Sequence, residues 1–145
     1  MAAKVKLITL WSREVENRSG TLAESLSPLV ATGANLQVLM GYRHPGDSRA
    51  TIELFPVSGK RTTAAAQSAG FSAAAIPTLL VEGDDRPGIA HAIARSLADA
   101  GINLAFLVAQ VVGKKYSAVV AFESETDARR AAGLIKKLKA PGKKR

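Results

Sequence analysis

Residues 84–104 have the sequence DDRPGIAHAIARSLADAGINL, and residues 16–36 have the sequence ENRSGTLAESLSPLVATGANL. The two stretches begin 68 positions apart and align without a gap. The identical positions are Arg18 and Arg86, Gly20 and Gly88, Leu29 and Leu97, Gly33 and Gly101, Asn35 and Asn103, and Leu36 and Leu104. A repeat at one fixed offset indicates a structural unit that occurs twice. We therefore predict that residues 1–68 and 69–137 fold on the same plan.

Each copy contains the elements of a βαββα unit. Leu22, Leu26 and Leu29 recur at the spacing of one helix face. Gly33 and Gly101 are suited to end the two helices, because glycine adopts the left-handed conformation at little cost. The predicted strands are residues 5–15, 34–42 and 49–57, then 76–82, 102–112 and 116–123, and the predicted second helices are residues 59–69 and 125–139.

The order of these elements predicts a ferredoxin-like fold of class α+β. In a βαββαβ unit the strands form an antiparallel sheet and both helices lie on one face. Residues 71–75 can form a short fourth strand in the first unit, whereas no comparable stretch closes the second. The predicted domains are residues 1–72 and 73–139, followed by a disordered basic tail at residues 140–145.

The strand predicted at residues 102–112 is apolar at nearly every position. A sheet that is covered by helices on one face only should alternate between apolar and polar residues. An apolar second face indicates contact with another surface, which is either the other repeat or a second chain. We therefore predict that the units pair and that the chain forms a homodimer.

Composition excludes several classes of protein and of site. The chain has 145 residues, of which 47% are hydrophobic, and it has no cysteine, so disulfides and thiolate metal sites are absent. The N-terminus lacks the apolar segment of a signal peptide, and no run of the roughly 20 apolar residues that cross a bilayer occurs. We expect a cytoplasmic protein without a membrane association.

The formal net charge of +8 is concentrated at the C-terminal end. Six of the 20 Lys and Arg residues lie at positions 136–145, and the other fourteen nearly balance the 12 Asp and Glu residues. A short charged end is typical of a solvated tail. The charge therefore does not favour nucleic acid as a partner.

The polar turn and the strand after each helix resemble the hallmark of ACT domains, which are small amino-acid-sensing modules of metabolic enzymes and regulators. The resemblance rests on residues 84–90 and 100–104, and on residues 15–22 and 33–36 in the first copy. The chain is identified as a tandem ACT-domain protein, similar to the serine-sensing domain of phosphoglycerate dehydrogenase. The resemblance covers residues 4–138.

The resemblance implies that an amino acid or a similar small metabolite binds where two ACT units lie side by side. It also implies that the signal passes to a partner protein that remains unidentified, without a cofactor and without catalysis. The ligand-binding positions it implies are Asn17, Gly20 and Asn35 in the first copy and Asp85, Gly88 and Asn103 in the second. Where the family can have a histidine that contacts the ligand, this chain has Val15 and Gly83.

Structural roles are the alternative for these residues. Asn17 and Asp85 can cap a helix, and asparagine after a helix-ending glycine, as at Asn35 and Asn103, suits a turn. Gly20 and Gly88 can serve the packing of each helix on its sheet.

Other functions also share the predicted fold. Acylphosphatases use an arginine and an asparagine, but their phosphate-binding loop has no counterpart here. RNA-binding domains of this topology stack bases on aromatic side chains of a motif that this chain lacks. His44 and His91 are isolated in the sequence and do not indicate a metal site. An interaction adaptor that has the ACT fold but no ligand remains an alternative.

Overall fold

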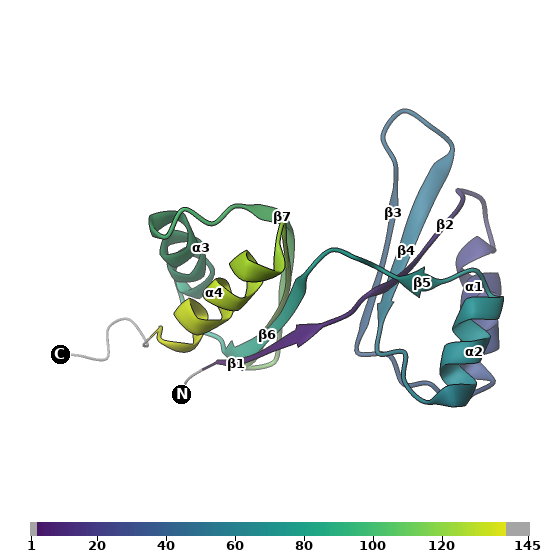
Figure 1. The fold of residues 1–145 in the computed structure, drawn as a ribbon, viewed down its shortest axis with the longest axis horizontal. Coiled ribbons are helices and arrows are strands. Elements are labelled where there is room, and N and C mark those ends of the chain that lie inside the picture. Colours follow the sequence, from purple (N-terminus) through teal and green to yellow (C-terminus); the bar gives the residue numbers. More distant parts are fainter. Residues whose placement is uncertain (1–2, 139–145) are drawn as a thin grey trace. The chain divides into compact units, whose positions relative to one another are not determined.

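The structure is a computed structural model that describes residues 3–138. The chain divides into two units, shown in Figure 1: of the described residues, the first unit contains residues 9–75, and the second contains residues 3–8 together with residues 76–138. Each unit has a four-stranded antiparallel sheet with two helices on one face. The predicted α+β, ferredoxin-like fold is confirmed. Within the described residues, none of the helices is long and apolar enough to span a membrane.

The sheet of the first unit has the strand order β5-β2-β4-β3, as in other ferredoxin-like folds. Its elements are β2 (Trp11–Glu16), α1 (Thr21–Val30), β3 (Val38–Arg43), β4 (Arg49–Phe55), α2 (Lys60–Ser68) and β5 (Ser72–Ala73). The core lies between the helices and the sheet, where Val15, Ile52 and Leu54 pack with Leu29 of α1 and Ala66 of α2.

The second unit has the equivalent strand order β1-β6-β8-β7. Its elements are β1 (Lys4–Ile8), β6 (Thr78–Asp84), α3 (Ile89–Asp99), β7 (Leu104–Val112), β8 (Lys115–Phe122) and α4 (Glu125–Lys136). The core contains Val81, Ile93, Leu97, Val120 and Phe122. The fourth strand that the sequence of the second copy lacks is therefore β1, the first strand of the chain.

The prediction of a single strand over residues 5–15 is wrong. Val5 pairs with Val81 of the second unit, whereas Val15 pairs with Ala50 of the first. The stretch is rich in β-prone residues throughout, and this local pattern contains no information about which distant strand each half joins. The predicted first domain, residues 1–72, includes residues 3–8, which the structure places in the second unit. The predicted tail, residues 140–145, lies outside the described residues.

Candidate functional site

The turn before the first helix of each unit has the same backbone geometry in both copies. Gly20 and Gly88 precede α1 and α3 with φ angles of 89° and 86°, in the left-handed region that favours glycine. The N–H of Asn17 donates to the carbonyl of Ser48 at 2.7 Å, and the N–H of Asp85 donates to the carbonyl of Lys114 at 2.8 Å. The following hairpin thus holds each turn in place.

Neither α1 nor α3 has a side-chain cap. By contrast, Ser124 accepts a hydrogen bond from the N–H of Asp127 at the start of α4. The alternative that Asn17 and Asp85 cap their helices is therefore wrong. The N–H groups in the first turn of a helix have no partner within the helix, so both turns present donors at the positive end of a helix dipole.

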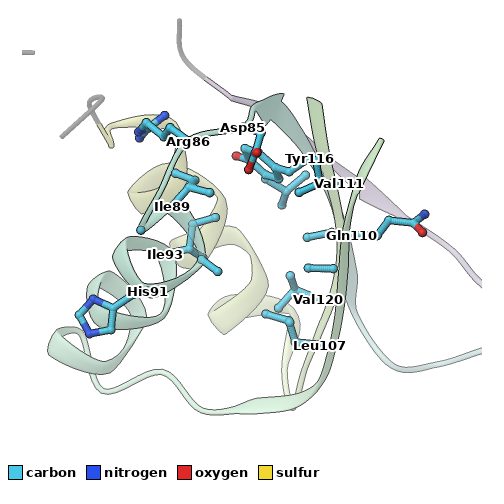
Figure 2. A pocket seen from close by; sticks show the side chains of 15 residues that line it. Asp85, Arg86, Ile89, His91, Ile93, Leu107, Gln110, Val111, Tyr116 and Val120 are labelled. Carbon is cyan, nitrogen blue, oxygen red and sulfur yellow. The ribbon is translucent and has the colours of Figure 1, made fainter. Parts of the chain in front are cut away.

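A cavity of about 340 Å³ lies between α3 and the sheet of the second unit. Figure 2 shows Ile89 and Ile93 of α3 facing Leu107, Val111 and Val120 of the sheet across this space. The side chains of Gln110 and His91, which also border it, point away. The walls are therefore almost entirely apolar.

Polar groups gather at the end of this cavity nearest the turn. Asp85, Arg86 and Tyr116 line it there, and Figure 2 shows Asp85 beside Tyr116. Tyr116 is only 7% exposed, and burial raises the pKa of its hydroxyl, while the nearby charge of Arg86 acts in the opposite direction. An apolar cavity with a few polar groups at one end is the usual form of a small-molecule site.

Gly83 leaves room for the ring of Tyr116. The two residues are cross-strand partners in β6 and β8, and a Cβ atom added at Gly83 would lie 2.8 Å from Cε2 of Tyr116. A histidine, which the family can have at this position, is therefore incompatible with a tyrosine in this conformation on the adjacent strand.

The first unit has a cavity of about 240 Å³ in the corresponding place. The lining residues that correspond at the 68-residue offset are Asn17 and Asp85, Arg18 and Arg86, Thr21 and Ile89, Leu22 and Ala90, Gly41 and Ala109, Tyr42 and Gln110, Arg43 and Val111, Ala50 and Ala118, and Ile52 and Val120. The two units therefore share the position of a cavity as well as the fold. The lining itself has changed, because Thr21 and Arg43 stand where the second unit has Ile89 and Val111.

The structure brings some of the predicted ligand-binding residues together. Asn17 lines the cavity of the first unit, Asp85 and Gly88 line that of the second, and Gly20 directly precedes α1. The hydrophobic and tyrosine residues of the two cavities were not predicted as site residues. The pattern of α3 did place Ile89 and Ile93 on one helix face, but the same pattern is typical of core residues.

Asn35 and Asn103 do not lie with these residues. Both are exposed and lie just before β3 and β7. β2 and β3 both pair antiparallel with β4, so they run parallel, and Asn17 after β2 lies at the opposite end of the sheet from Asn35. The same geometry separates Asp85 from Asn103. One unit alone cannot bring both polar positions to one small ligand.

Comparisons with known proteins agree with this fold. A family model described as the ACT domain matches residues 77–140. The structure is similar to that of protein BT0572 from Bacteroides thetaiotaomicron, with a TM-score of 0.74 and 14% identity over 92% of this chain and 99% of that one. A comparison of the sequence with curated proteins gives no match.

Two aspartate kinase structures are also similar. The ligand-free regulatory subunit of aspartate kinase from Thermus thermophilus has a TM-score of 0.62 and 13% identity, over 93% of this chain and 95% of that one. Aspartate kinase from Synechocystis has a TM-score of 0.59 and 18% identity, over 92% of this chain but only 26% of that one. At this level of identity the similarity establishes a shared fold and nothing further.

Proposed function

We propose that this chain is a regulatory protein that binds a free amino acid and signals to a partner protein, because the model of the ACT domain family matches residues 77–140. The observation that most supports the proposal is the cavity of about 340 Å³ in the second unit, whose apolar walls end at Asp85 and at the start of α3. Small-molecule pockets commonly have volumes of roughly 300–1,000 Å³.

The groups around this cavity match the parts of an apolar amino acid. The Asp85 carboxylate can accept hydrogen bonds from the ligand ammonium group. The N–H of Ile89 donates to the carbonyl of Arg86, but the N–H groups of Ala90 and His91 in the first turn of α3 can donate to the ligand carboxylate. The space between Ile93 and Val111 suits an aliphatic or aromatic side chain. We therefore propose an amino acid with an apolar side chain, bound with its charged end at the turn.

The similar fold of a protein described as the regulatory subunit of aspartate kinase supports a regulatory role. The match covers 95% of that chain. We propose that this chain acts through a partner protein and does not itself catalyse a reaction.

A ligand of this kind should stabilise the folded protein. At a concentration of about 100 times Kd it adds roughly 2.7 kcal/mol to the free energy of unfolding. For a chain of this size that corresponds to a rise in melting temperature of about 5–10 °C. We expect Ala109→Phe to abolish the rise, because Ala109 lines the cavity and a phenyl ring would fill it. A thermal-shift series with L-leucine, L-isoleucine, L-valine, L-methionine and L-phenylalanine measures both effects.

The matched control is Val30→Phe, which adds a similar side chain at a residue of α1 in the first unit that is 71% exposed. This variant should respond to ligand like the unaltered protein. If none of these amino acids raises the melting temperature, the sensor function is incorrect and the ligand-free adaptor is favoured. If Ala109→Phe keeps the response, the ligand binds elsewhere.

We further propose that two chains pair through β7. This strand is at the edge of its sheet, and its side chains Leu107, Val108, Val111 and Val112 are 43–68% exposed. Such an edge is a template for pairing with another strand. If two β7 strands pair antiparallel, the start of each lies beside the end of the other. That arrangement would bring Asn103 of the partner subunit toward the turn that contains Asp85, which one unit alone cannot do.

The expected particle is therefore a dimer with twice the chain mass of 15.2 kDa. Val108→Lys should give a monomer, because a charged side chain on an edge strand opposes strand pairing. The control Val30→Lys makes the same change at a residue of α1 that is 71% exposed and should leave the dimer intact. Light scattering after size-exclusion chromatography distinguishes the two states. A monomeric unaltered chain, or a dimeric Val108→Lys variant, would contradict pairing through β7.

A further inference from the structure

The helix α1 exposes large apolar side chains along one flank. The side chains that it buries against the core of the first unit are Thr21, Ser25 and Leu29. Beside them on the helix, at a spacing of one turn, lies a row that we call the apolar stripe and that consists of Leu22, Leu26 and Val30. Leu22 is 45% and Val30 is 71% exposed, whereas Leu26 packs partly against the core. Contiguous exposed apolar side chains mark interaction sites on soluble proteins.

The second unit shows that the fold does not require this stripe. At the corresponding positions its helix α3 buries Ile89, Ile93 and Leu97. The row beside them, at the offset of 68 positions from the apolar stripe, is exposed and consists of Ala90, Ala94 and Ala98. The helix thus packs on its sheet with alanine throughout this row. The large side chains of the apolar stripe are therefore not explained by the packing of α1 on its own unit.

The surface next to the apolar stripe suits a second helix. Two helices pack when a ridge of side chains spaced four residues apart enters a groove on the other helix. The apolar stripe is such a ridge, and the exposed row beside it is small, consisting of Ala23, Ser27 and Ala31. Glu24 is the only charged residue of α1, and its carboxylate already pairs with Arg18 at 2.9 Å. An apolar helix face can therefore approach α1 without removing an unpaired charge from water.

The charges at one end of the apolar stripe are positive. Nη2 of Arg61 donates to the carbonyl of Ala31 at 3.4 Å, which places the start of α2 beside the C-terminal end of α1. Lys60 and Arg61 are both exposed, and neither forms an ion pair within the part of the chain that the structure describes. No acidic residue occurs in the sequence between Glu53 and Glu82. Carboxylates of a partner would therefore meet two cations here.

A protein fits these observations better than a lipid surface does. A helix that lies on a membrane has Lys and Arg residues along its polar face. The helix α1 has no Lys or Arg, and both cations at its end belong to α2. The positive charge therefore lies at one end of the apolar stripe and does not follow it.

We infer that the apolar stripe is the surface through which this chain binds its partner protein, and that the partner presents an amphipathic helix with carboxylates at the end of its apolar face. The inference rests on the proposed function, in which a partner protein receives the signal. It assigns the two tasks to different units, because the amino acid binds in the second unit and the partner binds to the first. The carboxylates of the partner lie beside Lys60 and Arg61.

The test is the binding of two synthetic amphipathic helical peptides to the full chain, measured by fluorescence anisotropy. Both peptides have the same face of leucine residues and glutamine at most polar positions. They differ only at their ends, which carry glutamate in one peptide and lysine in the other. We expect saturable binding of the glutamate peptide only. Val30→Asp should weaken this binding about tenfold or more, as expected for the loss of an apolar contact in an interface.

Ala98→Asp is the matched control, because it places the same charge at the corresponding exposed position of α3. It should leave the affinity for the glutamate peptide unchanged. Lys60→Glu should weaken binding of the glutamate peptide and strengthen binding of the lysine peptide, because it reverses the charge at the end of the apolar stripe.

Three results would overturn the inference: no binding of the glutamate peptide, equal affinity of the Val30→Asp variant and the unaltered chain for it, or equal affinity of the unaltered chain for both peptides. Binding of the unaltered chain to phosphatidylglycerol vesicles that Val30→Asp abolishes would assign the apolar stripe to a membrane instead. None of these measurements contains an amino-acid ligand, so their outcome is separate from that of the thermal-shift series.

Discussion

Deletion of residues 1–8 is expected to unfold the second unit and to leave the first unit folded. β1 pairs with β6 over five residue pairs, from Lys4 with Glu82 to Ile8 with Thr78. Without it, β6 becomes an exposed edge and the core between the sheet and α4 opens to water, since Val5 packs against that core. The free energy of unfolding of a small domain is only about 5–15 kcal/mol. The destabilisation caused by the loss of one of four strands should exceed this value. Amide NMR of the truncated chain would show this as a loss of dispersed signals from residues 76–138 only.

A relocated strand provides the control for this deletion. In the usual ferredoxin-like order the fourth strand follows the second helix, and α4 ends at Lys136. Residues 1–8 attached behind the C-terminus through a flexible linker should therefore restore the second unit. Retention of the signals of residues 76–138 after the simple deletion would show that β1 is dispensable.

A point substitution tests the same contact more gently. Val5→Asp places a charge against the core of the second unit. It should lower the free energy of unfolding of this unit by about 3 kcal/mol. Lys4→Ala changes an exposed neighbour on the other face of the strand and should have little effect.

The second large effect is expected at Gly83. Gly83→Ala should lower the free energy of unfolding by about 1–3 kcal/mol, because the new methyl group overlaps the ring of Tyr116 and the ring is buried. The three closest atoms, Cε2, Cζ and Oη, all belong to this ring. Chemical denaturation monitored by circular dichroism measures the change.

Two further variants identify the cause. Leucine has none of the three overlapping atoms, so the cost of Gly83→Ala should be much smaller in a Tyr116→Leu background, which a double-mutant cycle measures directly. Gly133→Ala is the matched control, since Gly133 lies within α4 and a Cβ atom there would meet nothing within 4 Å. It should stabilise the helix slightly. An equal cost of Gly83→Ala in both backgrounds would exclude the overlap with Tyr116 as the cause.

The sequence by itself was sufficient to predict the repeat and most of the fold. Glycine at positions 20 and 88, and again at 33 and 101, marks where each first helix begins and ends, and all four have positive φ angles in the structure. These features depend on local backbone preferences and on the spacing of apolar residues, which a sequence contains directly. The same offset of 68 positions predicted that Asn17 and Asp85 occupy equivalent places, and the two cavities agree with it.

Tertiary structure alone decided which strands pair and which polar residues meet. The pairing of Val5 with Val81 joins positions that are far apart in the chain, and an apolar strand can pair with many partners. Asn35 follows Gly33 closely in sequence, as the family motif requires, yet the sheet places it at the opposite end from Asn17. Contacts between distant segments determine both the strand pairing and the position of Asn35, and no local pattern encodes them.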